Sequence, residues 1–372
     1  MANTSAVNVK WTSRVEFIVA LLGYSIGMPE FWRVPYLTYR NGGGPFIIAY
    51  ILLMLVCGLP LYFLELALSQ FSGKGPWRFW DICPLLRGMG IAIAVINALS
   101  AVNTAIMGAW SIEYQILRIS DGIDYLGTIS VVFVAYLFVL RLLAAISIVK
   151  SVESMGKMLY VTALLPVVLI VMIWIRALTL PGSTKGMLYF VSADFRRFAD
   201  PQLWIEASFQ TFITLGPGWG GLMMMGAHNK FRTNCFQSSV ISTSATLTFG
   251  LLNGLVVFSV LGVMSEEINV PIPDLMTSGG FSIGFIAYPK ALSYFPLPQL
   301  WCAIFYLVLL LPGLDAMAIL TEPLLMIFEE MFPKMLNNRR IPLLTVVSVV
   351  MFLAGLPFAT QFNLTWQEWR IL

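Results

Sequence analysis

Charged residues are scarce in this chain. Asp, Glu, Lys and Arg make up 11% of its 372 residues, whereas they supply about a quarter of a typical globular chain. Hydrophobic residues make up 58%. That balance does not suit a soluble domain, so the composition predicts a polytopic membrane protein. The net charge of +3 is too small to indicate a nucleic-acid partner.

Cysteine and histidine are also rare. The four cysteines lie in or beside apolar segments and lack the spacing of a metal site, so we expect buried or cytoplasmic free thiols; they are Cys57, Cys83, Cys235 and Cys302. No nucleophile–base pair or cluster of metal ligands is evident, which argues against an enzyme. The first ten residues are polar, so we expect no cleaved signal peptide and insertion directed by the first membrane helix.

Long apolar segments are abundant instead. Nine are long enough to cross a bilayer, which takes about 20 residues. They lie near residues 14–38, 45–71, 88–118, 125–147, 155–179, 204–229, 236–264, 296–328 and 341–361. Basic residues gather ahead of the first span and after the even-numbered spans, which predicts a cytoplasmic N-terminus. The tail, residues 362–372, would then be extracellular, and Asn363 in it begins a glycosylation motif.

Two of the nine spans are interrupted. In the first, Gly27, Pro29 and Glu30 fall in the middle of an apolar helix, and Pro29 lacks a backbone donor. In the sixth, residues 215–221 (LGPGWGG) place four glycines and a proline in an apolar helix. Unpaired backbone is tolerated at membrane depth only where it is buried in protein or lines a cavity. Such a pair of breaks predicts an inverted-repeat transporter with its site between them.

The fold class predicted is therefore an all-α polytopic membrane protein with broken helices in spans one and six. One transporter domain would cover residues 1–361. Its first repeat would run from about residue 14 to 179, and an incomplete second repeat from about 204 to 361.

Motifs along the chain resemble one family of transporters. Residues 32–44 (WRVPYLTYRNGGG) resemble the first-helix signature of the neurotransmitter:sodium symporters, solute carrier family six. Residues 58–68 (GLPLYFLELAL) resemble the second helix of that family. Further similarities follow in family order at residues 150–157, 179–182, 257–262 and 313–315. The resemblance covers roughly residues 10–361 and implies sodium-driven symport by alternating access.

The resemblance implies two sodium sites. One would use the carbonyls of Gly23 and Ile26 together with Pro312, Asp315 and Ala316, the last standing where the family has a hydroxyl. Carboxylates such as Asp315 are costly inside apolar spans and functional by default; the alternative is a buried Asp paired with a helix end. The other sodium site would use Ser25, Glu30, Thr214 and Thr246.

The implied chloride pocket departs from the family pattern. It would be lined by Tyr50, Gln210, Thr214, Thr246 and Gly250. The family has Asn at the positions of Glu30 and Thr246 and Ser at that of Gly250, so donors are lost where a carboxylate is gained. One interpretation is that Glu30 supplies the negative charge that chloride otherwise brings. The other is that Glu30 pairs with Arg33 one turn on, in a protein that no longer transports.

The substrate pocket implied by the resemblance would be lined by Gly27, Ser100, Thr104, Ile213, Gly218, Trp219 and Leu320. Gly27 favours a small amino acid or amino-acid-like solute, because monoamine carriers of the family have Asp there. Two departures weaken that assignment: Thr104 replaces a tyrosine that holds the substrate carboxylate, and Pro29 removes a backbone donor for the same group. Glu65 would accept hydrogen bonds from the freed amides of the sixth span.

Gate residues are implied at both ends of the molecule. Arg33 belongs to the outer gate. Lys10, Trp11, His228, Glu322 and Glu330 match the inner gate at the cytoplasmic mouth. Asn8 replaces the arginine of that gate, and His228 replaces a tyrosine. A lone histidine is more often structural than a switch, although its ordinary pKa permits a pH effect.

The family has twelve spans, and nine are found here. The tenth would complete the second repeat and bring the acidic partner of Arg33, so we expect a truncated product or a fold completed by another chain or a missing C-terminal segment. The function predicted is a sodium-coupled symporter of the plasma membrane that carries a small solute. The alternative is a non-transporting homologue that acts as a binding or regulatory membrane protein.

Overall fold

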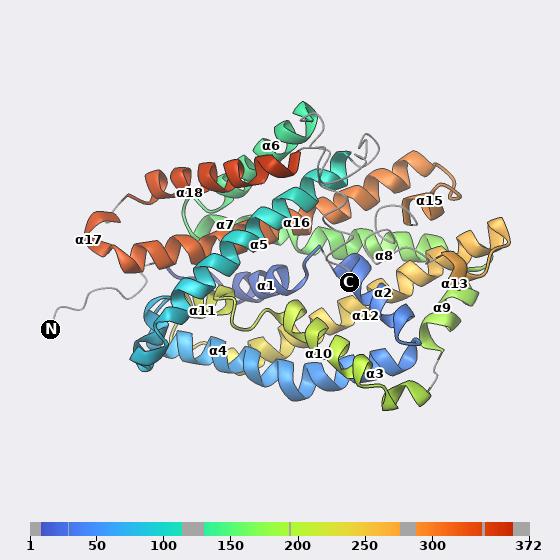
Figure 1. Ribbon diagram of the computed structural model, residues 1–372, viewed down its shortest axis with the longest axis horizontal. Helices are drawn as coiled ribbons and strands as arrows, with labels where there is room; N and C mark the ends of the chain where they lie inside the picture. Colours follow the sequence, from blue (N-terminus) through green and yellow to red (C-terminus); the bar gives the residue numbers. More distant parts are fainter. Residues whose placement is uncertain are drawn as a thin grey trace.

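The computed structural model of the chain is a bundle of helices that run roughly along one axis (Figure 1). It describes residues 9–28, 30–113, 130–192, 195–275, 288–336 and 339–359, and within these ranges it contains no strand. The prediction of an all-α fold is confirmed for this part of the chain. Pro29, Asn8 and the tail with Asn363 lie outside the described residues.

Six helical segments are long and apolar enough to cross a membrane. They are Gly44–Ser72 (α3 Gly44–Leu53, a π-helical turn Met54–Gly58 and α4 Leu59–Ser72), Pro84–Ala109 (mostly α5, Gly88–Glu113), Val152–Leu178 (α7 Val152–Thr162 and α8 Leu164–Leu178), Cys235–Ile268 (α12), Pro298–Met331 (α16) and Arg340–Ala359 (mostly α18, Arg340–Gly355). The bent pair α1 (Arg14–Ser25) and α2 (Glu30–Arg40) makes a seventh if it is counted as one span.

The two remaining predicted spans are helical but do not meet the same test. α6 (Val131–Ser147) has 17 residues, and α10 (Pro201–Leu215) and α11 (Gly221–Ala227) lie on either side of the second break. Nine membrane crossings therefore stay a prediction, as does the division into two repeats. Short helices connect the spans: α9 (Ser183–Val191), α13 (Ile272–Leu275), α15 (Tyr288–Leu292) and α17 (Pro333–Leu336).

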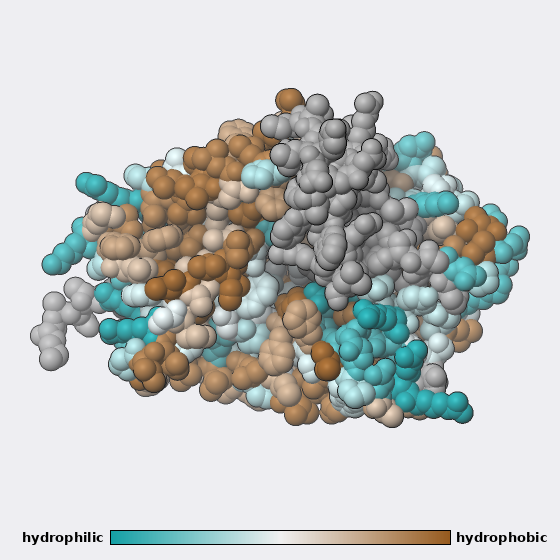
Figure 2. All heavy atoms as spheres, viewed as in Figure 1, coloured by the Kyte–Doolittle hydropathy of each residue, from teal (hydrophilic) through white to brown (hydrophobic). Residues whose placement is uncertain are grey.

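Apolar side chains cover much of the outside of the bundle. Figure 2 shows hydrophobic residues over the left half of this face and along its lower edge, and hydrophilic ones at both ends of the long axis and at the lower right. Large exposed apolar side chains lie on the outer helices, among them Leu52, Leu64, Phe138, Leu142, Val346 and Val350. A continuous apolar surface of this kind suits the hydrocarbon core of a bilayer, where all backbone groups must be paired within helices. The chain is an integral membrane protein.

The long helices α12 and α16 form the centre of the bundle. In the most apolar stretch of 18 residues, 72% of the residues are buried in α12 and 61% in α16, compared with 22% in the last span, Arg340–Ala359. α1 packs against both central helices, and α2 packs against α12. A buried arginine ties the outer helices to one another: Arg141 on α6 donates to the carbonyl of Ala101 on α5 at 2.6 Å and contacts the sulfur of Met351 on α18 at 3.4 Å.

Both predicted helix breaks are confirmed. α1 begins with a capping box formed by Ser13 and Glu16 and ends at Ser25, and α2 begins at Glu30 with its axis bent by 52°. The second break runs from residue 216 to 220. Its backbone is left-handed at Gly218 and Gly220, with φ of +83° and +81°, a conformation that glycine alone adopts without penalty.

Candidate ion and solute site

The two breaks face each other across a small gap. The hydroxyl of Tyr24 at the end of α1 donates to the carbonyl of Gly216 at 2.5 Å. Glu65 on α4 accepts from the amide of Gly218 at 2.8 Å, which is the role the sequence predicted for it. Asn97 on α5 donates to the carbonyl of Trp219 at 2.5 Å. The sequence analysis did not predict Tyr24 or Asn97 as site residues. The signal available for both was a polar side chain inside an apolar span.

A cavity of about 150 Å³ lies between the breaks. Six of the seven residues predicted for the substrate pocket line it: Gly27, Ser100, Thr104, Ile213, Trp219 and Leu320. Gly218 is not among the described lining residues, and its backbone amide donates to Glu65. Asn103, which was not predicted, also lines the cavity. Among the described lining residues there is no Lys or Arg, and Glu30 is the one carboxylate.

Asp315 lies buried on α16 beside the end of α1. Among the described residues, neither of its carboxylate oxygens has a hydrogen-bond partner. The hydroxyl of neighbouring Thr162 donates instead to the carbonyl of Met158 at 3.0 Å. A Cβ added to Gly23 would lie 3.4 Å from Oδ2, so α1 passes close to the carboxylate. The sequence analysis left open that Asp315 pairs with a helix end; within the described residues, no such hydrogen bond is formed. A buried charge in this condition is costly unless a cation pairs with it or the carboxylate takes up a proton.

The other residues implied for that sodium site lie around the same point. Ile26 is the buried C-cap of α1, Pro312 lies inside α16 one turn before Asp315, and Ala316 lines the cavity. A helix end with unpaired carbonyls and a carboxylate oxygen are the donors that hold a hard cation such as sodium at a broken membrane helix. The residues present fit a sodium ion, which would be held by the Gly23 and Ile26 carbonyls and by Asp315.

The second implied sodium site has the same kind of unsatisfied oxygen. The hydroxyls of Ser25 and Thr246 and one carboxylate oxygen of Glu30 are buried and have no hydrogen-bond partner in the part of the chain that the structure describes. Ser25, Glu30 and Thr214 line the central cavity. These residues also fit a hard cation, because buried polar atoms without partners are rare in folded proteins.

Glu30 is the first residue of α2, and its carboxylate lies among the residues implied for the chloride pocket. Oε1 accepts from the hydroxyl of Thr214 at 2.5 Å and from the side-chain amide of Gln210 at 2.9 Å. The hydroxyl of Tyr50 donates to Thr214 at 3.3 Å. A Cβ added to Gly250 would lie 3.6 Å from Oε2. Two of the donors that would face a bound halide, Thr214 and Gln210, therefore face this carboxylate.

Within the described ranges, Glu30 and Arg33 form no ion pair. The guanidinium of Arg33 lies over the ring of Phe209, 4.9 Å from its centroid. The backbone carbonyl of Glu30 accepts from the side chain of Asn253 on α12 at 2.8 Å. Asn253 is a further residue that the sequence did not indicate, and it holds the start of α2 against the central helix.

Comparison with known proteins places the chain in a family. The model of the sodium:neurotransmitter symporter family matches residues 8–116 and 112–369. The chain belongs to this family. It is 32% identical over 405 residues to the sodium- and chloride-dependent GABA transporter 2 of Rattus norvegicus, covering 95% of this chain and 67% of that relative. It is 31% identical over 404 residues to the protein of the same name in Mus musculus, covering 94% and 67%.

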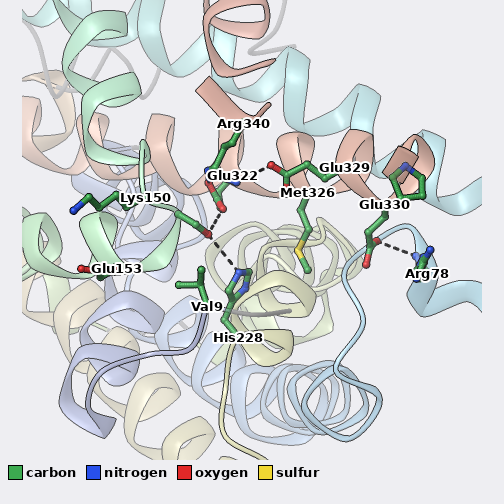
Figure 3. A pocket seen from close by; sticks show the side chains of 12 residues that line it. Val9, Arg78, Lys150, Glu153, His228, Glu322, Met326, Glu329, Glu330 and Arg340 are labelled. Atoms are coloured by element: carbon green, nitrogen blue, oxygen red, sulfur yellow. Dashed lines mark hydrogen bonds and ion pairs between the residues drawn. The ribbon is translucent and has the colours of Figure 1, made fainter. Parts of the chain in front are cut away.

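This family member has a second, larger cavity of about 400 Å³ at the end of the bundle where residue 9 lies (Figure 3). We call it the mouth cavity; Val9, Ser151, His228, Glu322, Glu330 and Arg340 are among the residues that line it. Arg340 forms ion pairs with Glu322 and, at 3.0 Å, with Glu329. The mouth cavity thus brings together three of the residues predicted for the inner gate.

The inner-gate residues that the structure describes form no ion pair with one another. Glu330 accepts from the backbone amides of Gly75, Trp77 and Arg78 at 2.7, 3.1 and 3.0 Å. Lys10 instead donates to the carbonyl of Ala227 at 2.7 Å, and burial lowers its pKa. The indole of Trp11 donates to the carbonyl of Met225 at 3.0 Å. The N-terminal segment is therefore fastened to the end of α11, and Glu330 to the turn after α4.

Proposed function

We propose that the chain is a sodium-coupled symporter that carries a small amino-acid-like solute by alternating access around its two helix breaks. The observation that carries the proposal is Asp315, whose two buried carboxylate oxygens lack hydrogen-bond partners among the described residues, beside the broken end of α1. A cation bound there would hold α1 against α16. Because α1 also lines the solute cavity, cation binding and solute binding would favour the same arrangement of the two helices.

The proposed solute class rests on the cavity and on the relatives. The cavity of about 150 Å³ admits only a small molecule, and Gly27 leaves room where a side chain would otherwise project. The relatives reported above are GABA transporters by name. No Lys or Arg lines the described cavity, so a solute carboxylate would be held by a bound sodium ion and by hydroxyls such as those of Ser100 and Thr104.

We also propose that transport does not require chloride. The Glu30 carboxylate accepts the hydrogen bonds of Thr214 and Gln210, and its second oxygen lies beside Gly250 and Tyr50. A chloride ion in the same place would meet a fixed negative charge a few ångströms away. Since like charges repel strongly where water is excluded, Glu30 and a halide would compete for one position.

The proposed orientation puts the N-terminus and the mouth cavity on the cytoplasmic side of the plasma membrane. Basic residues such as Lys150, Arg339 and Arg340 lie at this end of the bundle, in keeping with the distribution expected of cytoplasmic loops. The mouth cavity would then be the exit path of the solute.

Uptake into proteoliposomes tests the proposed function. Purified protein would be given pooled labelled amino acids and amines under an inward sodium gradient, with an equal choline gradient as the control. We expect accumulation only with sodium. Equal label in the two conditions, from protein shown to be folded by its solute-free thermal transition, would refute transport and favour a binding or regulatory protein.

A further inference from the structure

His228 lies in the mouth cavity beside the start of α7 and near α16 and α18. It is the residue after α11, and it is buried. Its ring contacts the hydroxyl of Ser151, and Ser151 contacts Glu322 on α16, which in turn pairs with Arg340 on α18 (Figure 3). This chain of contacts connects the helix that follows the second break to the helices on the far side of the mouth.

The hydrogen atoms available to these contacts can be counted. Glu322 is paired with Arg340, so it is ionised and can only accept. The hydroxyl of Ser151 lies 2.5 Å from Glu322 and therefore donates its single hydrogen to that carboxylate. Toward Nε2 of His228, 3.4 Å away, Ser151 then presents only a lone pair. Nδ1 lies 2.8 Å from the carbonyl of Met224, which also can only accept.

Both ring nitrogens of His228 therefore face acceptors. A neutral imidazole carries one N–H, so either of its tautomers leaves one lone pair facing another. The imidazolium form carries two N–H groups and satisfies both contacts. Burial opposes it and lowers the pKa of His228 below its ordinary value, so the ring takes up its proton toward the acid end of the pH range. The charged groups that face the ring from the surrounding elements are Lys10 in the N-terminal segment, Glu322 on α16 and Arg340 on α18. The other charged or titratable residues that line the same cavity are Lys150 and Glu153 at the start of α7, Glu329 and Glu330 on α16, and Arg78 after α4.

The backbone supports the same assignment. Ser151 has φ of +57°, one of three non-glycine residues with positive φ in the described part of the chain. A serine pays a steric penalty in this region, and such strain persists where the surrounding contacts hold the residue in place. Here the strained backbone puts the hydroxyl between His228 and Glu322.

We propose that His228 is a proton-binding site that latches the mouth cavity shut. With the proton bound, the imidazolium donates to Ser151 and holds α11 against α7, α16 and α18. When the proton leaves, the Nε2 contact becomes a repulsion between lone pairs and the mouth opens. The latch goes beyond the proposed function, since it concerns a different cavity and requires no transported solute.

Distance measurements between two spin labels test the latch without transport. The labels would be attached at Arg232→Cys, after α11, and Lys334→Cys, on α17, both exposed, in protein whose native cysteines are replaced by serine. Double electron–electron resonance in lipid nanodiscs would follow the distance from pH 8.5 to 5.5. Because one proton is linked to closure, the ratio of closed to open protein is expected to rise by up to about tenfold per pH unit.

Variants identify the group that titrates. In the variants His228→Gln and His228→Tyr, the distribution of distances between the two labels should not change with pH, since neither side chain can become an imidazolium. Ser151→Ala should also flatten the response, whereas Ser293→Ala, an exposed serine far from the mouth, should behave as the wild type. A wild type that does not respond to pH, or histidine variants that respond as the wild type does, would overturn the proposal. Absence of solute uptake would leave this result untouched.

Discussion

Asp315→Asn is expected to abolish sodium-driven uptake. The substitution keeps the shape of the side chain and removes the buried negative charge that would face the cation. Two unit charges about 4 Å apart interact by about 4 kcal/mol at an effective dielectric constant of 20. Loss of that interaction should lower the apparent sodium affinity roughly a thousandfold. The measurement is initial uptake rate against sodium concentration in proteoliposomes.

The matched control for this prediction is Asp274→Asn, which makes the same chemical change at an exposed position on α13. It should leave the sodium dependence within about twofold of the wild type, since exposed single charges contribute little. If Asp315→Asn also stayed within twofold, Asp315 would not be a sodium ligand, and its unpaired oxygens would need another explanation.

Glu30→Gln is expected to change the anion requirement of transport. In the wild type, uptake should be the same whether the anion is chloride or gluconate. The Gln side chain keeps the length of Glu30 and can still accept from Thr214, but it brings no charge. Uptake in gluconate should therefore fall on the order of 100-fold, since a buried counter-charge is lost. Glu267→Gln, at an exposed position, is the matched control and should have no effect.

The double variant Glu30→Asn with Gly250→Ser restores the residues that the family has at these two positions. There is room for the second change, because a Cβ on Gly250 makes only ordinary van der Waals contact with its neighbours. With the carboxylate removed and a hydroxyl added, uptake by this variant should require chloride. Uptake that proceeds normally in gluconate for both Glu30 variants would contradict the assignment of Glu30 as a tethered counter-charge.

The helix breaks could be predicted from the sequence because their cause is local. Gly27 and Glu30 interrupt an apolar run of side chains, and Gly218 and Gly220 permit the left-handed backbone found between α10 and α11. The residues that line the central cavity were predicted from the family resemblance, because the family pattern relates positions that are far apart in the chain. Gly218 is not among the described lining residues, and its backbone amide donates to Glu65.

The orientation of charged side chains could not be predicted in the same way. Glu30 is three residues from Arg33 and 180 residues from Gln210, and only the packing of α2 against α10 determines that its carboxylate meets Gln210. Likewise, Glu330 is satisfied by three backbone amides of a turn some 250 residues earlier, so it does not pair with Lys10. Such contacts depend on the docking of distant segments, which residue spacing does not encode.

The measurement that tests the central claim most directly is the effect of sodium on thermal unfolding of the purified protein in the absence of chloride. Sodium gluconate would be compared with choline gluconate, for the wild type and for Asp315→Asn. At a sodium concentration about 100-fold above its dissociation constant, bound sodium should stabilise the wild type by about 2.7 kcal/mol, and the variant should show no such gain. Equal melting temperatures of the wild type in the two salts would contradict a sodium site at Asp315.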